Sequence, residues 1–578
     1  MPGGAPGPAS APSDLPPAHL WRYVGEGAAH VALAFTASPD VGPFASFAGK
    51  VLRLPKRAAD HPGSANPGQE ARDLQKLAFV GEIIAPLIGA QYIQQSVPIR
   101  TTPEFRRQVA AAIRPLRPAA RLSGSTLPPG INPLELPGDD DPDLGPCGLS
   151  SVTMATLYDD LTLLPDSCCP GGGSTLAFEV KPKWGFMPAS PFVASAAAGT
   201  LSASVLEEPA PIREQRRLLK SRVCRGCMHR NLKAKAGPGP DLPGEGLGDY
   251  CGTDLFSGNE AHIHATLLDI ARAPRNNLRL FIDGDQRPLG DLDSAELDTG
   301  LDLAAALGIV ARILAFRQDS NAMAHHPCDL MFRLAQAQFL TDVIDIEGAL
   351  ELCPELFERT IGALMSLAPA QPSAPFDLSR LSQPLPVLKA PLCGQDLDSL
   401  AAALALPALA KEGDSGQAHS MAEWRRDVLE DITHLLLADT LAGAPSPVAV
   451  DFARSLTVAD LLGDRIRYLR KLTCAATLKD CSVYVTFQVR CCSAPRSGAE
   501  ESPPCTGASS GVLPLPDGRE VVWRVQVADL DFKSLVARSA RWLSLDHLIA
   551  RRYGEANPAV LERARHLAKQ PRCLWSRV

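Results

Sequence analysis

The chain of 578 residues is 45% hydrophobic and 21% charged, which provides for folded cores and excludes a protein that is disordered throughout. Its 57 Lys and Arg against 64 Asp and Glu give a net charge of -7, so a uniformly basic nucleic-acid-binding chain is excluded and an anionic ligand requires a local basic patch. The 52 prolines and the aromatic content of 5% predict a loop-rich architecture with low-complexity insertions.

Cysteine usage and hydropathy indicate a soluble intracellular protein. The 15 cysteines are odd in number and include the adjacent pairs Cys168-Cys169 and Cys491-Cys492, which disfavours a secreted disulfide framework. The N-terminal sequence lacks a basic start and an apolar stretch, so we expect no signal peptide. Asp302 and Arg312 interrupt the most apolar stretch, which falls short of the about 18 apolar residues of a membrane span. We expect the protein in the cytoplasm and the nucleus.

Composition separates a folded framework from several insertions. Residues 1–17 are rich in Pro, Gly and Ala and predict a disordered tail. Similar composition predicts Pro/Gly/Ala-rich insertions near residues 57–68, 123–145, 237–248, 369–417 and 493–511. No repeat of fixed period is visible, which argues against a solenoid or a propeller.

The first elements in chain order are two strands and a helix. Residues 31–35 and 50–54 are apolar, β-prone runs on either side of a Pro/Gly/Ser-rich turn, which predicts an antiparallel pair. The apolar residues of 74–87 follow helical spacing. Residues 176–180 predict a further strand, and 424–436 predict an amphipathic helix. A nucleotide-covering kinase lobe begins with two strands and a helix, as many other α+β domains do.

Two alternating segments near the C-terminus predict a hairpin. Residues 483–489 and 521–527 each alternate apolar and polar side chains, as half-buried strands do, and a Pro/Gly/Ser-rich segment separates them. Asp480 precedes the first strand and Asp529 follows the second, so antiparallel pairing brings both carboxylates to the open end. Phosphoryl transfer uses one Asp near the attacking hydroxyl and another that holds Mg²⁺. Asp also flanks strands as an ordinary turn residue, so this pattern alone leaves both interpretations open.

Two shorter motifs suit a polyphosphate ligand. Gly25 and Gly27 lie in a turn that leads into a strand, where backbone N–H groups can approach a phosphate, although a short GEG is also an ordinary turn. In an extended segment Glu179, Lys181 and Lys183 share one side, which suits a polyphosphate with its metal or, alternatively, a solvated strand face.

A dense basic run extends from Arg213 to Lys235. It predicts an anion site, a nucleic-acid contact or a solvated helix face, and its lack of aromatic residues gives no support for base stacking. Within the run, Cys224 and Cys227 form a CxxC that could join His229 and Cys251 in a zinc site, but a single CxxC is a modest signal. No Ser/His/Asp or Cys/His catalytic set is recognisable.

Together these motifs resemble the inositol-pentakisphosphate 2-kinase family. The family hallmark ExKPK stands as Glu179-Val-Lys-Pro-Lys183, followed by WGFMP. The other matching motifs occur in family order: GEGAAH from Gly25, VCRGCMHRNLK from Val223, DLFSGN from Asp254, NNLR from Asn276, KDCS from Lys479 and DLDFK from Asp529. The resemblance covers the chain from Trp21 to about Tyr553.

The resemblance implies a nucleotide side and a substrate side. The residues implied on the ATP side are Gly27, Ala28, Ala29, His30, Arg53, Arg121, Tyr158, Asp159, Asp160, Glu179, Lys181 and Asn276. Those implied on the inositol phosphate side are Lys183, Lys233, Asn277, Arg279, Lys533, Arg538 and Arg541. Beyond Lys533 this chain departs from the family's Pro and Tyr-bearing stretch, so Arg538, Arg541 or Trp542 would substitute there.

The resemblance also implies the chemistry. Asp480 is similar to the family's base for the inositol 2-hydroxyl, Lys181 is the second catalytic residue and Asp529 is the Mg²⁺ ligand. ATP and Mg²⁺ are the implied cofactors. The zinc-binding His/Cys set of plant members is not recognisable in residues 322–353, so the resemblance implies no zinc.

We therefore predict an α+β, two-lobed kinase-like fold related to inositol polyphosphate kinases, with residues 18–188 as the N-lobe and 189–578 as the C-lobe. The predicted function is ATP-dependent phosphorylation of inositol 1,3,4,5,6-pentakisphosphate at its 2-hydroxyl to give inositol hexakisphosphate. The alternative is a non-catalytic inositol-phosphate-binding or scaffold protein on the same fold. We expect a monomer with no membrane or nucleic-acid partner.

Overall fold

The computed structural model describes residues 15–26, 30–36, 42–55, 69–117, 154–165, 173–187, 210–235, 250–289, 300–315, 328–353, 403–405, 421–430, 432, 464–490, 509–566 and 573. The chain forms two compact units. Unit 1 comprises Met1–Leu77, Gln94–Asp160 and Asp377–Pro384, and unit 2 comprises Ala78–Ile93, Leu161–Phe376 and Leu385–Val578.

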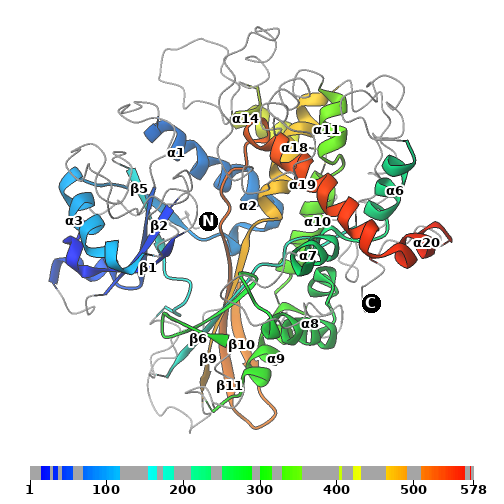
Figure 1. Cartoon of the computed structure of the whole chain (residues 1–578). Helices are drawn as coiled ribbons and strands as arrows, with labels where there is room; N and C mark the ends of the chain where they lie inside the picture. Colours follow the sequence, from blue (N-terminus) through cyan, green and yellow to red (C-terminus); the bar gives the residue numbers. More distant parts are fainter. Residues whose placement is uncertain are drawn as a thin grey trace, which may run out of the picture. The chain divides into compact units, whose positions relative to one another are not determined.

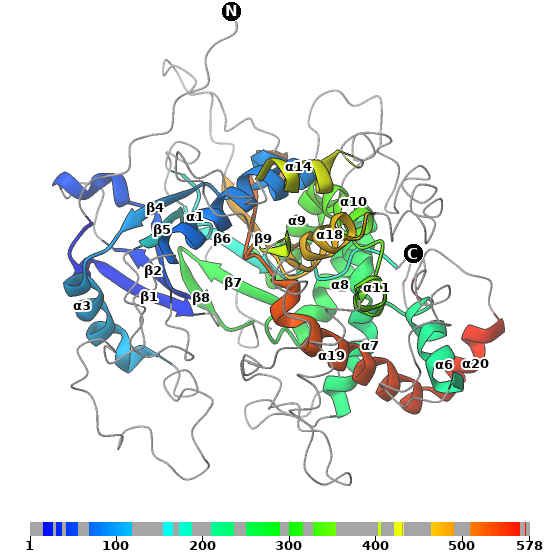
Figure 2. The same ribbon diagram turned by 90° about the horizontal axis from the view of Figure 1, so that it is seen from above.

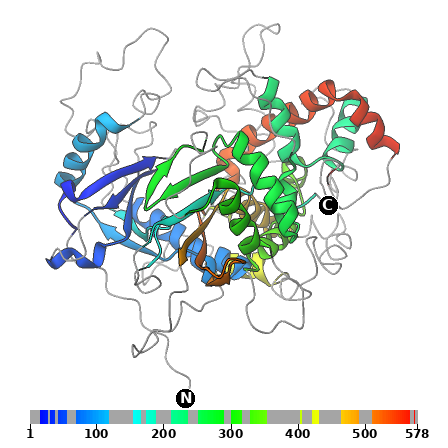
Figure 3. The same ribbon diagram turned by 90° about the horizontal axis from the view of Figure 1, so that it is seen from below.

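Unit 1 contains a five-stranded antiparallel sheet in the order β1-β2-β3-β5-β4. The strands are β1 (Trp21–Glu26), β2 (His30–Phe35), β3 (Lys50–Pro55), β4 (Ser96–Arg100) and β5 (Met154–Asp159). Val31 pairs with Leu54 in register, so the antiparallel pair predicted from the sequence is confirmed. Helix α3 (Pro103–Ile113) follows Thr102, whose side chain accepts from the Phe105 N–H, and Phe105 belongs to the core of this sheet. Figure 3 shows this helix beside the strands of unit 1.

The predicted helix over residues 74–87 is also confirmed. Helix α1 (Gln69–Phe79) continues through a π-helical turn, Val80–Ile84, into α2 (Ala85–Ile88). The helix ends at Gly89, where the backbone has a φ of 99°, a conformation that glycine adopts readily because it has no Cβ. The division between the units falls inside α1.

Unit 2 contains a six-stranded antiparallel sheet in the order β10-β11-β9-β6-β7-β8. The strands are β6 (Thr175–Val180), β7 (Leu278–Ile282), β8 (Asp285–Arg287), β9 (Ser482–Arg490), β10 (Ser510–Pro514) and β11 (Glu520–Ala528). The predicted pairing of the two C-terminal strands is confirmed, with Val483 opposite Val527. Strand β6 lies against the other side of β9, which places the ExKPK motif beside the hairpin.

Alternate residues of the central strands face one hydrophobic core. Phe178 of β6 and Phe487 of β9 stack there with ring centroids 6.2 Å apart. Helices α8 (Glu260–Arg272), α9 (Leu303–Leu314) and α10 (Leu330–Thr341) contribute to the same core (Figures 1 and 2). Glu179 and Ser482 alternate with these residues, so they project from the opposite face of the same strands.

The remaining helices of unit 2 are α6 (Ala210–Lys220), α7 (Arg225–Lys235), α11 (Ile346–Leu352), α14 (Met421–Leu429), α18 (Arg465–Leu478), α19 (Leu535–Ala556) and α20 (Pro558–His566). Helix α14 buries Trp424 and Val428 as predicted, whereas Leu436 lies outside the described residues. The long helix α19 runs past α6, α7 and α11 (Figures 1 and 2). Among the described helices, none is long and apolar enough to cross a membrane.

The predicted lobes and insertions relate to this structure as follows. The described residues 161–165 and 173–187, predicted to belong to the N-lobe, lie in unit 2. Of the predicted tail and insertions, only residues 15–17, 403–405 and 509–511 lie within the described part. The division into lobes at residue 188 stays a prediction.

Candidate functional site

The open end of the β9–β11 pair carries both predicted carboxylates. The last residue pair of this ladder joins Ser482 to Ala528, so Asp480 and Asp529 lie just beyond the same end. Helix α18 ends immediately before Asp480, whose backbone N–H donates to the Thr477 carbonyl over 3.1 Å. Asp529 has a φ of 59°, an unusual backbone conformation for a residue with a side chain. Backbone strain of this kind is concentrated at functional sites.

A compact charged cluster surrounds Asp529. The Lys181 ammonium lies 3.1 Å from Asp529 Oδ2 and 3.4 Å from Glu179 Oε1. Ser482 Oγ lies 2.9 Å from Asp529 Oδ2 and 2.8 Å from Glu179 Oε1, and its single proton can be donated to either carboxylate. Burial alone would lower the pKa of Lys181, but Asp529 and Glu179 outweigh it, and the pKa lies above its ordinary value. Lys181 therefore remains charged at neutral pH.

Asp480 is held by two lysines. Lys183 Nζ lies 3.1 Å from its Oδ1, and Lys533 Nζ lies 2.9 Å from its Oδ2. Burial would raise the pKa of Asp480, yet the two ammonium groups outweigh it and lower the pKa to about 2. Lys183 has a φ of 61°, so the simple alternation of an extended segment ends there. Lys183 thus pairs with Asp480 while Lys181 pairs with Asp529, and the shared side of Glu179, Lys181 and Lys183 stays a prediction.

Gln338 of α10 fixes this turn. Its amide donates to the Lys183 carbonyl over 2.8 Å and to the Leu478 carbonyl over 3.1 Å, and its Oε1 accepts from the Gly185 N–H over 2.8 Å. A side chain at Gly185 would meet the Phe256 ring at 2.7 Å, so only glycine allows this close approach. Gln338, which is completely buried, therefore ties the ExKPK segment to the helix end that precedes Asp480.

A cavity of about 440 Å³ opens beside Asp480 within unit 2. Lys183 and Lys533 line it together with Asn277, Arg538, Arg541 and Trp542, which the family resemblance implies on or near the substrate side. Asn276, implied on the ATP side, lines the same cavity. Its further cationic lining consists of Lys181, Lys220, Arg225, Arg230, Arg275 and Lys479. Such a surplus of cations over the four lining aspartates, Asp342, Asp345, Asp480 and Asp546, suits a ligand that carries several phosphates.

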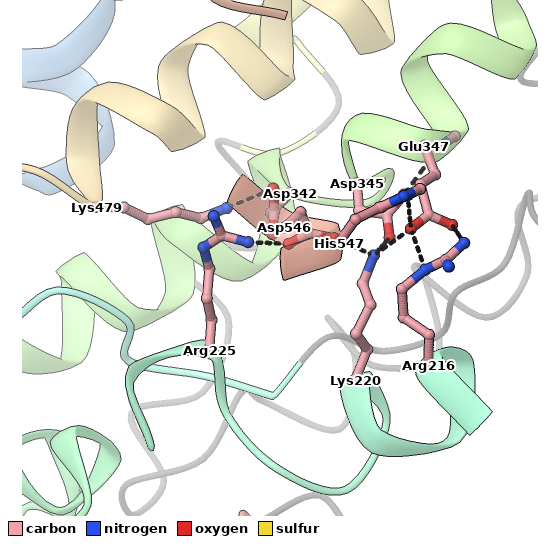
Figure 4. Close-up of polar contacts among 10 residues, drawn as sticks. Arg216, Lys220, Arg225, Asp342, Asp345, Glu347, Lys479, Asp546 and His547 are labelled. Carbon is pink, nitrogen blue, oxygen red and sulfur yellow. Dashed lines mark hydrogen bonds and ion pairs between the residues drawn. The ribbon is translucent and has the colours of Figure 1, made fainter. Parts of the chain in front are cut away.

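Ion pairs neutralise part of this lining, as Figure 4 shows. Lys220 Nζ lies 2.5 Å from Asp345 Oδ2 and 2.7 Å from Asp546 Oδ2, and Arg225 also pairs with Asp546. Lys479 Nζ lies 2.5 Å from Asp342 Oδ1. It also lies 3.8 Å from the centre of the Trp184 ring. These cations belong to the wall, so the basic run from Arg213 to Lys235 is in part a buried ion-pair network rather than a solvated helix face.

The remaining predicted residues occupy several places. Arg279 NH1 binds Glu179 Oε2 over 3.1 Å in unit 2. In unit 1, Arg53 lies 5.6 Å from the Tyr158 ring, and Asp159 pairs with Lys50 over 2.5 Å. His30 begins β2, and the Asp160 N–H donates to the Gly49 carbonyl over 2.7 Å. Residues Gly27, Ala28, Ala29 and Arg121 lie outside the described residues, and for Lys233 the structure describes only the backbone in α7.

Four buried thiols form a separate metal-binding arrangement. The sulfur atoms of Cys224, Cys227, Cys251 and Cys573 all lie within 4.8 Å of one another. Cys224 Sγ is 3.6 Å from Cys251 Sγ, and Cys573 Sγ is 3.9 Å from Cys227 Sγ. A tetrahedral zinc ion with Zn–S bonds of about 2.3 Å places its sulfurs about 3.8 Å apart, so the donor set fits Zn²⁺. The fourth member is Cys573 rather than the His229 considered from the sequence.

Two residues of these sites, Gln338 and Cys573, carry no signal that identifies them in the sequence alone, whereas a third, Ser482, does. Gln338 is one polar residue in an apolar helix, and Cys573 lacks a nearby partner in the sequence. Ser482 is the last residue of the KDCS motif, and that motif is the signal that could identify it.

Comparison with known proteins agrees with this geometry. Residues 23–548 match the sequence model of the family described as inositol-pentakisphosphate 2-kinase. A rice protein (Oryza sativa subsp. indica) of that name is 26% identical over 283 residues, which cover 46% of this chain and 52% of the relative. A zebrafish (Danio rerio) protein of that name is 24% identical over 265 residues, which cover 46% of this chain and 43% of the relative.

A third relative of the same name, from Arabidopsis thaliana, is 22% identical over 370 residues, which cover 59% of this chain and 70% of the relative. The chain spans about half the length of the rice relative that it matches. The family match extends over most of the chain, from the first strand of unit 1 to helix α19. The chain therefore belongs to the inositol-pentakisphosphate 2-kinase family.

Proposed function

We propose that this protein transfers the γ-phosphoryl group of ATP to the 2-hydroxyl of inositol 1,3,4,5,6-pentakisphosphate, giving inositol hexakisphosphate and ADP. The observation that carries the proposal is Asp480, a carboxylate held by Lys183 and Lys533 beside a cation-lined cavity. The family match supports the same reaction. The relatives' printed names describe this activity for those proteins.

Asp480 is the base of the proposed reaction. It accepts the proton of the 2-hydroxyl while the hydroxyl oxygen forms a bond to the γ-phosphorus and the bond from that phosphorus to the leaving ADP oxygen breaks. With a pKa of about 2, the carboxylate is ionised but weakly basic before substrate arrives. Substrate phosphates that bind Lys183 and Lys533 offset the positive charge that these two ammonium groups exert on Asp480. Its pKa then rises toward the range in which it accepts a proton.

Asp529 and Lys181 act on the phosphoryl group in this proposal. Asp529 is part exposed, and its carboxylate is the donor type that Mg²⁺ prefers, so Asp529 would hold the ion. The bound ion would neutralise charge on the phosphates. Lys181 remains charged beside Asp529 and is placed to bind a phosphate oxygen. The assignment of His30, Arg53 and Tyr158 to ATP is supported by the family resemblance.

The test is turnover by the purified protein. Incubation with Mg-ATP and inositol pentakisphosphate should give hexakisphosphate, separated by anion-exchange chromatography. Asp480→Asn should lower kcat by roughly 10² to 10⁴-fold because the base is lost. Asp517→Asn, in the exposed turn between β10 and β11, should retain activity. Wild-type protein that binds the pentakisphosphate tightly but makes no product would instead establish the non-catalytic binding protein.

A further inference from the structure

Arg275 occupies a backbone position that favours glycine. It is the second residue of the turn Pro274–Asn277, which the Asn277 N–H closes by donating to the Pro274 carbonyl over 2.8 Å. Its φ is 46°, in the left-handed region. Turns with positive φ at this position select Gly, Asn or Asp, because a larger side chain is strained there. An arginine in this place calls for a reason beyond the turn itself.

The other residues with a positive φ lie either in a favoured turn or at the site around Asp480 and Asp529. In the described part of the chain, four residues other than glycine have positive φ: Lys183, Arg275, Asp283 and Asp529. Asp283 precedes Gly284 in the two-residue turn between β7 and β8, where Asp-Gly is a favoured pair. Lys183 and Asp529 belong to the reaction site described above. Arg275 is left, and it lines the same cavity as Lys183.

The charge of Arg275 is available at this cavity. Within the described residues no ion pair involves Arg275, whereas Lys220, Arg225 and Lys479 are each held by a buried aspartate. Arg275 lies in the turn that ends at Asn277, and Asn277 also lines the cavity. Tyr250 also lines the cavity, and its hydroxyl lies 3.5 Å from Asn277 Nδ2.

We propose that Arg275 binds one phosphate group of the inositol substrate and sets the preference for the pentakisphosphate over tetrakisphosphates that lack this group. The inference rests on the proposed function and adds a residue to its substrate side. A guanidinium presents two parallel N–H donors to a phosphate, which gives both affinity and selection for a phosphate at one ring position. The turn strain is retained because glycine at this position would lose that contact.

Binding without turnover tests the inference. Calorimetric titration of the full chain with inositol pentakisphosphate, in the absence of ATP, should show a Kd about 10- to 100-fold higher for Arg275→Ala. Arg275→Lys should recover part of this loss. Arg275→Gly should bind as weakly as the alanine variant and yet unfold at a higher temperature, because it relieves the strained φ. Arg272→Ala, on the last turn of α8, is the matched control and should keep the wild-type Kd.

Substrate analogues separate a contact from a general charge effect. Among the tetrakisphosphates made by removing one phosphate from the substrate, one should bind wild type and Arg275→Ala within twofold of each other, because it lacks the contacted group. An equal loss for all of them, or an equal loss in Arg272→Ala, would overturn the inference. So would an unchanged Kd in Arg275→Ala while wild type makes hexakisphosphate, an outcome that leaves the proposed function intact. Wild type that binds no inositol polyphosphate would overturn both.

Discussion

At the residue scale, each carboxylate at the open end of the β9–β11 pair lies beside a lysine, while the cavity next to it carries an excess of cations. Asp480 faces Lys183 and Lys533, and Asp529 faces Lys181. Each of these carboxylates thus lies beside a lysine, and the two lysines at Asp480 lower its pKa. On the proposed function, substrate phosphates that bind these lysines would change the charge environment of Asp480 as well as position the inositol ring.

The lowered pKa of Asp480 predicts an acid-sensitive contribution to stability. The pKa is about 2 in the folded protein and about 3.9 in an unfolded chain. A group with a lowered folded pKa stabilises the fold above its unfolded pKa, and this contribution is lost as the pH falls through the folded value. Wild type should thus unfold at higher urea than Asp480→Asn at pH 5 and above, and the difference should shrink from pH 4 toward pH 2. A difference that is constant over this range would contradict the assignment.

Among the elements, α7 contributes both to the thiol cluster and to the wall of the cavity. Cys224 precedes it and Cys227 lies in its first turn, while its later residues include Arg230, which lines the cavity, and Lys233. Cys251 belongs to the segment that also carries Tyr250. A metal bound by the four thiols would therefore fix two parts of the cavity wall at once.

The thiol cluster predicts one zinc ion per chain. Metal analysis of the purified protein should find about one equivalent of zinc. Cys251→Ala should lose most of it, and a strong chelator should lower the unfolding temperature of wild type. Cys474→Ala is the matched control, since Cys474 is a buried thiol outside the cluster and should retain the metal. Full zinc content in Cys251→Ala would show that the ion is held elsewhere.

Helix α19 depends on a buried carboxylate. Asp546 meets both Lys220 of α6 and Arg225 of α7 (Figure 4). Asp546→Asn would leave these buried cations without that charge, which should lower the free energy of unfolding by about 3 kcal/mol. Glu555→Gln, on the exposed end of the same helix, should change it by less than about 0.5 kcal/mol. Equal effects of the two substitutions in urea unfolding would contradict a role for the network.

At the scale of the whole molecule, the net charge of the chain and the charge of the cavity lining have opposite signs. The chain has a net charge of -7, yet the cavity lining holds more cations than anions. Inositol pentakisphosphate should therefore bind through local electrostatics that salt screens. The Kd should rise by roughly tenfold or more between 50 and 500 mM KCl. A salt-independent Kd would mean that the cavity cations are not the binding groups.

Local sequence patterns predicted the pairing of β9 with β11 and the residues that lie at its open end. The alternation in β9 and β11 depends on one buried sheet face, so it is visible in short segments, and antiparallel pairing then placed Asp480 and Asp529 at one end. The family motifs predicted that Lys183 and Lys533 lie on one side of the site, and both line the same cavity. The turn at Lys183 could not be predicted, because Gln338 imposes it from a distant helix. Cys573 lies 346 residues from Cys227, a separation at which no spacing rule applies.

The position of β6 between β7 and β9 has a consequence for how the protein is made. Glu179 and Ser482, which meet across β6 and β9, are 303 residues apart, and Lys181 and Asp529 are 348 apart. Such long-range strand pairing slows folding, because a large loop must close before the contacts that stabilise it can form. During synthesis the strand that carries ExKPK leaves the ribosome long before its neighbour β9 exists. The edge of β6 that later pairs with β9 is unpaired until then and must stay protected from other chains, so slow translation or scarce chaperones would favour aggregation over assembly of the sheet.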